Sequence, residues 1–138
     1  MKRGTPDHPK TLMLANELAI KKYAAVGLLE MLWHFTARYA PRGDIGRFSD
    51  GIIGNSLDWG GNIPELIAAL VKVGWLERNN EYRLIVHDWS DHADDTADKY
   101  LANHGMLYCD GKEPRRKPDK GVKVRRVAEN SGKIRKTP

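Results

Sequence analysis

The stretch from Phe48 to Val86 limits what this chain can fold into more than any other. It opens with a predicted helix, capped by Ser49, in which apolar residues recur at helical spacing. The segment DWGGN then breaks this helix, since paired glycines readily adopt the positive φ of a tight turn. A second amphipathic helix is expected between a capping Asn62 and a terminating Gly74. Two short helices joined by a tight turn are therefore predicted.

The residues that follow the second helix predict a β-hairpin. The segments Trp75–Glu77 and Tyr82–Val86 flank Asn79 and Asn80, and asparagine tolerates the left-handed backbone of a tight turn. Ahead of the first helix, residues 44–48 have room for one turn or for a brief strand that would pair with the hairpin. This order predicts an α+β winged helix-turn-helix, mostly helical with a small antiparallel hairpin as the wing.

Further helices are expected on both sides of this stretch. Apolar spacing predicts a short helix over Pro9–Ile20 and a longer one over Lys21–Ala40. The longer helix is apolar over a broad arc, as is typical of the central helix of a small bundle. A last helix is expected to begin at residue 90 or 91 and to end at residue 103 or 104.

The basic residues are concentrated near the C-terminal end of the sequence. The formal net charge of +5 divides into −2 for residues 1–104 and +7 for residues 105–138. The latter segment has scattered glycines and prolines and few large apolar residues, a composition typical of disorder. We therefore predict a winged domain over residues 1–104 and a basic, disordered tail over residues 105–138 that contacts a polyanion.

No sequence motif indicates an enzyme or a bound cofactor. The sequence has no Walker-type loop, no Gly-x-Ser-x-Gly element and no phosphate-cradling strand-loop-helix. Two histidines and four acids between His87 and Asp95 match no metal-site spacing, and a helix start accounts for the acids. A single cysteine, Cys109, excludes an intramolecular disulfide. With no apolar stretch of membrane-spanning length and no secretory signal, a cytoplasmic protein is expected.

The candidate DNA contacts fall on the helix pair, the wing and the tail. The second helix presents one acid, one base and two alanines, a weak surface for reading bases. Arginines of the wing and the tail suit phosphates better, and the scarcity of aromatic residues in the tail favours duplex over single-stranded DNA. The predicted DNA-binding residues are Asn55, Ser56, Asn62 and Lys72 on the helix pair, Arg47, Arg78 and Arg83 at the wing, and Arg115, Arg116, Lys117, Arg125 and Arg126 in the tail.

The chain from Pro9 to Asn103 resembles the N-terminal winged-helix domains of phage replication proteins, the replisome-organiser and DnaD-like group. The segments that carry the resemblance are GDIGRFSDGIIGNSLDW, LIAALVKVGWLE and LIVHDWSDHADD. The resemblance implies binding to replication-origin DNA or assembly with other replication proteins ahead of helicase loading. Members often carry a large second domain for helicase interaction, whereas a short basic tail follows here, so a role in helicase loading is not implied.

Two other functions remain open at this point. The nearly neutral second helix, together with a generous supply of apolar residues, also suits a winged-helix module for protein–protein interaction. A small transcriptional regulator is the other alternative, and it would require a dimer that reads paired half-sites.

Overall fold

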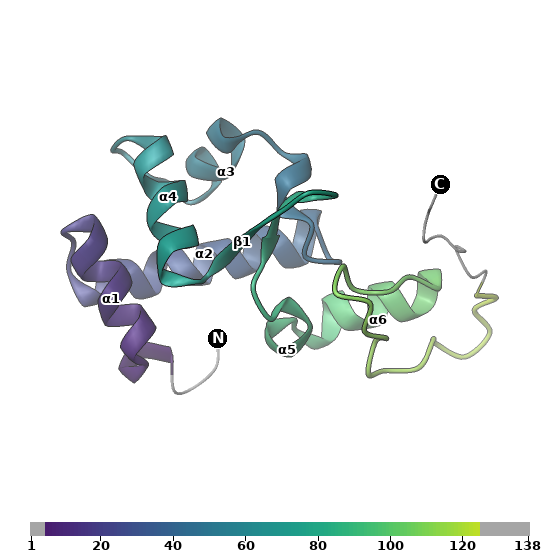
Figure 1. Cartoon of the computed structure of the whole chain (residues 1–138). Coiled ribbons are helices and arrows are strands. Elements are labelled where there is room, and N and C mark those ends of the chain that lie inside the picture. Colours follow the sequence, from purple (N-terminus) through teal and green to yellow (C-terminus); the bar gives the residue numbers. More distant parts are fainter. Residues whose placement is uncertain (1–4, 125–138) are drawn as a thin grey trace.

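A computed structural model describes residues 5–124 and bears out the α+β, mostly helical class with one small antiparallel hairpin (Figure 1). Helix α2 runs through the centre, with α1, α3, α4 and the hairpin arranged around it. None of the helices in this range has the length and apolar character needed to cross a membrane. In chain order the elements are η1 (Thr5–Asp7), α1 (Pro9–Leu18), α2 (Lys22–Tyr39), η2 (Ile45–Arg47), α3 (Asp50–Ser56), α4 (Ile63–Val73), β1 (Leu76–Asn79), β2 (Arg83–Val86), α5 (Trp89–His92) and α6 (Asp95–His104).

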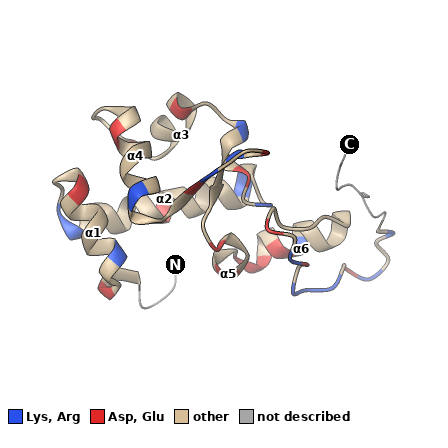
Figure 2. Ribbon diagram, viewed as in Figure 1, with Lys and Arg blue, Asp and Glu red and all other residues tan. Residues whose placement is uncertain are grey.

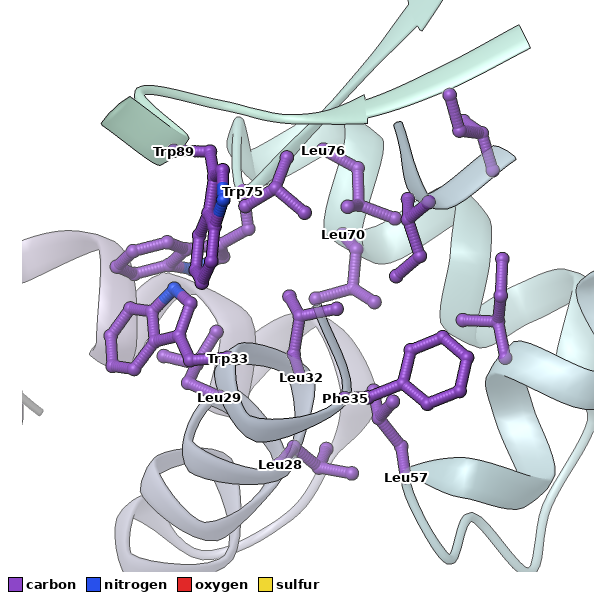
Figure 3. Close-up of a cluster of buried hydrophobic side chains, with 14 of the residues drawn as sticks. Leu28, Leu29, Leu32, Trp33, Phe35, Leu57, Leu70, Trp75, Leu76 and Trp89 are labelled. Carbon is purple, nitrogen blue, oxygen red and sulfur yellow. The ribbon is translucent and has the colours of Figure 1, made fainter. Parts of the chain in front are cut away.

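The core is built on the broad apolar surface of α2. Leu29 and Leu32 of this helix are fully enclosed, and they face Leu70 of α4 and Leu76 of β1 (Figure 3). Leu57, which ends α3, closes the same cluster. Burying one leucine side chain stabilises a fold by about 1.5–3 kcal/mol, so this cluster fixes α3, α4 and the hairpin against one helix.

The ends of α3 and α4 form as their residues predict. The Ser49 side chain accepts a 3.2 Å hydrogen bond from the N–H of Ile52, and Asn62 Oδ1 accepts one of 2.9 Å from the N–H of Glu65. Gly74 ends α4 with a φ of 98°, a left-handed conformation that glycine adopts without steric cost. These caps set the lengths of both helices and the turn between them.

The first two helices form with a break close to the expected one. Helix α1 ends at Leu18 rather than Ile20, because Ala19 takes a left-handed conformation with a φ of 54°. Lys21 then caps α2, which ends at Tyr39 before the Pro41 segment. This turn lets α1 fold back so that it packs on both α2 and α4.

The hairpin forms with a longer turn than expected. Its register runs from Leu76 opposite Val86 to Asn79 opposite Arg83, which leaves residues 80–82 in the loop. Asn79 Oδ1 accepts hydrogen bonds of 2.8 Å from the N–H groups of residues 81 and 82, and Arg83 has a φ of 68°. The Asn79 side chain therefore organises a three-residue loop in place of a tight Asn-Asn turn.

The brief strand that residues 44–48 could have formed is replaced by the 3-10 turn η2. In the described range the sheet has two strands only, and η2 packs directly on β2. A Cβ atom added to Gly46 would lie 2.3 Å from both the backbone N of Leu84 and the carbonyl oxygen of Tyr82. Only glycine permits this approach, which seats the chain before α3 against the hairpin.

The single helix predicted after the hairpin is wrong, because the chain breaks at Ala93 and continues as α6. Asp94 is the cap of α6, and its Oδ1 accepts a 2.8 Å hydrogen bond from the N–H of Ala97. The short helix α5 precedes it and buries Trp89, whose Nε1 donates to the carbonyl of Pro41 at 2.8 Å. The acids between His87 and Asp95 thus serve two helix starts rather than one.

The boundary predicted at residue 104 needs correction for the described residues. Tyr108 is only 1% exposed, and the N–H of Cys109 donates to the carbonyl of Arg42 at 2.9 Å. Residues 105–119 are therefore held on the domain, where composition predicts disorder. This segment is anchored by one buried aromatic ring and by hydrogen bonds to a buried carboxylate. Neither feature produces a periodic apolar pattern in the sequence. Residues 125–138 of the predicted tail lie outside the described range.

Candidate nucleic-acid interface

Helix α4, the predicted base-reading helix, presents a nearly neutral face. Lys72 Nζ donates to Glu17 Oε2 of α1 at 3.1 Å, so its charge is paired within the protein. Asn62 uses its side-chain oxygen as the cap of α4, and Glu65 adds an exposed acid in the first turn. An exposed ion pair contributes at most about 1 kcal/mol, so Glu17 weakens rather than blocks a contact by Lys72. The α4 face alone makes a poor surface for a polyanion.

The two polar residues predicted at the end of α3 are accessible. Asn55 is exposed and Ser56 is half-buried, beside the turn that leads to α4. Their side chains make no hydrogen bond to other residues of the described range. They can supply neutral hydrogen bonds next to the start of α4, but they supply no charge.

Arg83 holds the hairpin to η2 and α3, which is not the role predicted for it. Its Nε donates to the carbonyl of Gly46 at 3.0 Å and its Nη2 to the carbonyl of Phe48 at 2.6 Å. Its Nη1 forms a 2.7 Å ion pair with Asp50. Three groups of the protein thus occupy the guanidinium that the sequence predicts on DNA phosphates.

Arg78 is the wing arginine whose donors are available. It lies exposed on β1, opposite Leu84, and its side chain forms no hydrogen bond or ion pair with any residue the structure describes. Lys and Arg positions lie on the hairpin, on η2 and on the chain after α6, as well as on α1 and α4, and the hairpin also carries the exposed acids Glu77 and Glu81 (Figure 2). Among the described residues, the hairpin therefore contributes exposed Arg78, whereas the exposed Lys117, Lys120 and Lys123 lie on the chain after α6, away from the α3–α4 pair (Figure 1).

A cluster of arginines and aromatic rings joins the end of α2 to η2. Arg38 lies over the ring of Tyr39 at 5.6 Å from its centre, and Arg47 lies over the ring of Phe48 at 5.3 Å. The two rings are 6.4 Å apart and nearly perpendicular, and Arg47 also donates a hydrogen bond to the carbonyl of Tyr39. We call Arg38, Tyr39, Arg47 and Phe48 the arginine–aromatic surface.

Sequence reasoning predicted only Arg47 of this surface. The available signal was the pair of Arg-aromatic dipeptides, Arg38-Tyr39 and Arg47-Phe48. Each dipeptide taken alone supplies only one arginine and one ring. The turn after α2 is what brings the two dipeptides together, and its course is not visible in residue spacing.

A third arginine and ring pair links the hairpin loop to the chain after α6. Arg42 lies 5.6 Å from the centre of the Tyr82 ring, and its Nε donates to the carbonyl of Leu107 at 2.7 Å. Burial raises the pKa of the Tyr82 hydroxyl, and the charge of Arg42 and its hydrogen bond oppose that effect. Because Arg42 bridges three segments, its primary role is structural.

The tail residues predicted on DNA divide into structural and accessible ones. Arg115 donates to the carbonyl oxygens of Ser90 and Ala93, the latter at 3.2 Å, so it fastens the segment after α6 to α5. Arg116 forms an exposed 2.5 Å ion pair with Asp95. Lys117 is exposed and engages the protein through its carbonyl, which accepts from Lys99. Arg125 and Arg126 lie outside the described residues.

The cluster of histidines and acids between His87 and Asp95 is dispersed over the hairpin end and two helix starts. His87 lies between Glu77 and Asp88, and its Nε2 is 3.2 Å from Asp88 Oδ2. Within residues 5–124 no group of three or more His, Cys, Asp or Glu side chains is placed to hold a metal ion. Ion pairs engage His87, Asp88 and Asp95, and Asp94 caps α6.

These observations define a small α+β domain with a helix-turn-helix-like pair, α3 and α4, followed at once by a hairpin that carries an exposed arginine. Comparisons of the chain with protein-family models, with curated proteins and with solved structures found no match.

Proposed function

We propose that this protein is a non-enzymatic DNA-binding protein that acts on duplex DNA in phage or mobile-element replication, by binding an origin or organising a replisome. The observation that carries the proposal is the position of exposed Arg78 on a hairpin that follows α3 and α4 directly. This is the order in which winged helix-turn-helix domains place a helix in the major groove and a wing on the backbone.

In this proposal the positive charge of the hairpin and the C-terminal segment supplies most of the affinity. Arg78 and Lys117 are exposed, as are Lys120 and Lys123 further along the chain. Phosphate contacts of this kind dominate non-specific affinity and make it depend steeply on salt. The α3–α4 pair would then dock on the duplex and contribute Asn55 and Ser56 as neutral contacts.

A salt-titrated binding measurement with the full chain tests this proposal. We expect a labelled duplex to bind, and we expect Arg78→Ala to lower the slope of log K against log salt by about 0.9, the value for one lost phosphate contact. Lys22→Ala is the matched control, because it removes an exposed cation from the far end of α2. Absence of duplex binding at low salt, or equal effects of the two variants, would contradict the proposal.

The contribution of the last residues needs a truncation that leaves the core intact. Ending the chain at residue 104 would remove the buried Tyr108, so its effect on DNA affinity could not be separated from unfolding. Ending it at residue 124 removes five of the basic residues, Arg125, Arg126, Lys133, Arg135 and Lys136. We expect this truncation to lower the salt slope by about 0.9 for each of these residues that contacts a phosphate. An unchanged slope would show that none of them contacts the DNA.

A second candidate function, protein–protein interaction, is favoured by the α4 face itself. That face pairs its one lysine with Glu17 and leaves Glu65 exposed, so it does not attract a polyanion. If α4 contacts a protein, duplex affinity will be insensitive to charge on this face.

A further inference from the structure

We infer that the arginine–aromatic surface binds an unpaired nucleotide base of a strand that extends from the end of a DNA duplex. The inference rests on the proposed DNA binding and adds the kind of DNA that is bound. It departs from the sequence-based expectation that single-stranded DNA is the less suited partner. That expectation considered the tail, where aromatic residues are scarce, and not the end of α2.

The tyrosine of this surface is held in place and yet accessible. Tyr39 is 47% exposed at the last residue of α2. Its ring packs at 5.4 Å from the ring of Phe35 and at 6.4 Å from that of Phe48, both measured between ring centres. A ring fixed in this way loses little conformational freedom when it stacks on a ligand. Aromatic rings positioned like this are the usual platform for unpaired bases.

One guanidinium group, that of Arg38, lies over the exposed Tyr39 ring, and that of Arg47 lies over the neighbouring ring of Phe48. Arg38 and Arg47 are both exposed, and the hydrogen bond from Arg47 to the Tyr39 carbonyl ties η2 to the end of α2. Guanidinium groups next to a ring can stack on the base and can also pair with the phosphate that follows it. The surface therefore offers a π-face and positive charge within the span of one nucleotide.

Of the acids Asp44 and Asp50, Asp50 is paired elsewhere, and Asp44 offsets part of the positive charge of Arg47. Asp50 is already paired with Arg83 at 2.7 Å. Burial raises the pKa of Asp44, against the opposing charges of Arg47 and Arg42, which reflects the cost of keeping that carboxylate charged in its partly buried position. The guanidinium groups therefore favour an anionic ligand over a neutral peptide, and the exposed Tyr39 ring favours a nucleotide over an acidic peptide.

The surface is also next to the hairpin. Helix turn η2, which carries Arg47, packs on β2, and Gly46 is what permits the contact. We place the end of a bound duplex at η2, next to the hairpin that carries Arg78. A nucleotide that is unpaired at that end can reach the ring, whereas a base inside the duplex cannot, because its faces are covered by its neighbours.

The test compares two DNAs on the full chain, a blunt duplex and the same duplex with a short single-stranded thymidine overhang. We expect the overhang to bind at least about fivefold more tightly, the lower end of the range for one stacked base. Tyr39→Leu should abolish this difference and leave the blunt duplex affinity unchanged, and Tyr39→Phe should keep the difference. Tyr23→Leu is the matched control, since it removes a 77% exposed tyrosine at the other end of α2.

The possible outcomes separate this inference from the proposed function. Equal affinities for the two DNAs would overturn the inference and leave duplex binding in place. A preference for the overhang that survives Tyr39→Leu, or that Tyr23→Leu abolishes equally, would overturn the assignment to this surface. Failure to bind either DNA would overturn both.

Discussion

The hydroxyl of Tyr108 donates a 2.6 Å hydrogen bond to the carboxylate of Asp98, and both side chains are buried. The same carboxylate accepts hydrogen bonds from the backbone N–H groups of Arg116 at 2.7 Å and Arg115 at 3.1 Å. A charged carboxylate is costly to bury unless donors surround it, and here three donors do so. All three come from the segment after α6, so Asp98 is the residue that attaches this segment to the domain.

We expect Tyr108→Phe to lower the free energy of unfolding by about 1.5–3 kcal/mol, the usual contribution of a hydrogen bond to a charged group. The ring stays in place, so the loss reports on the hydroxyl. Urea unfolding measures it as a lower midpoint at an unchanged slope. Tyr100→Phe is the matched control, because Tyr100 is 46% exposed on the same α6 and should unfold like the parent chain. Equal midpoints for the two variants would show that the Asp98 bond contributes nothing.

The same carboxylate makes stability depend on pH in the acid range. Burial acts to raise the pKa of Asp98, but the hydrogen bonds from Tyr108, Arg116 and Arg115, aided by the charge of Arg115, lower it below its ordinary 3.8. The unfolded chain then binds the proton more readily than the folded one. The stability from this group is therefore present above about pH 3.8 and is lost as the pH falls through the lower folded pKa.

We expect the free energy of unfolding of the parent chain to fall between pH 5 and pH 2, with part of this fall due to Asp98. Asp98→Asn cannot titrate at this position, so its stability should be lower at neutral pH and should decline less steeply toward acid. Urea titrations at several pH values compare the two chains. Parallel declines would contradict the assignment to Asp98.

Local signals were enough to predict the elements that position the helix pair. Ser49, Asn62 and Gly74 mark helix ends through their own side chains or backbone freedom, and each acts within four residues of its position. The apolar stripes of α2 and α4 likewise follow from spacing along one helix. Such features are written into short segments and do not depend on the rest of the fold.

The features that the sequence did not reveal depend on contacts between distant segments. Tyr108 reads as an isolated aromatic among glycines and prolines, and only its contact with Asp98 makes it a core residue. Arg83 reads as a wing cation until η2 supplies the carbonyls that engage it. The arginine–aromatic surface was missed for the same reason, since a turn joins two dipeptides that are nine residues apart.

The contact between η2 and β2 predicts a strong effect at Gly46. A Cβ atom there would lie 2.3 Å from the backbone N of Leu84 in β2. Backbone atoms of a paired strand cannot move aside as the end of a flexible side chain can. We expect Gly46→Ala to destabilise the fold by more than about 3 kcal/mol, beyond the ordinary range for single substitutions. Gly27→Ala is the control, because nothing lies within 4 Å of a Cβ at that position of α2. The Gly27→Ala substitution should raise stability by up to about 1 kcal/mol. Equal urea midpoints for Gly46→Ala and Gly27→Ala would contradict the close packing of η2 on β2.

Cys109 is expected to be unreactive in the folded protein. Burial, together with the negative charge of Asp44, raises the pKa of its thiol to about 12, and Sγ contacts the carbonyl of Arg42 at 2.9 Å. The thiolate is the reactive form, so its population at neutral pH is very small. Alkylation by iodoacetamide should be slow in buffer and should reach the rate of an ordinary thiol in urea. Equal rates in both solvents would show that the segment around Cys109 is not held on the domain.

The charge of the α4 face decides whether that helix contacts DNA or a protein. Glu65→Lys changes this exposed position by two charge units next to the helix start, and it leaves the Asn62 cap on the backbone N–H intact. If α4 docks on a duplex, the variant should bind it several-fold more tightly and with a steeper salt dependence, by up to about 0.9 in slope for one new phosphate contact.

Asp91→Lys makes the same charge change on α5 and serves as the control for general attraction. A Glu65→Lys chain that is folded, as judged by its urea midpoint, and that binds duplex no better than the Asp91→Lys chain would show that α4 faces away from the DNA. The exposed face of α4 would then be the surface to test for a protein partner.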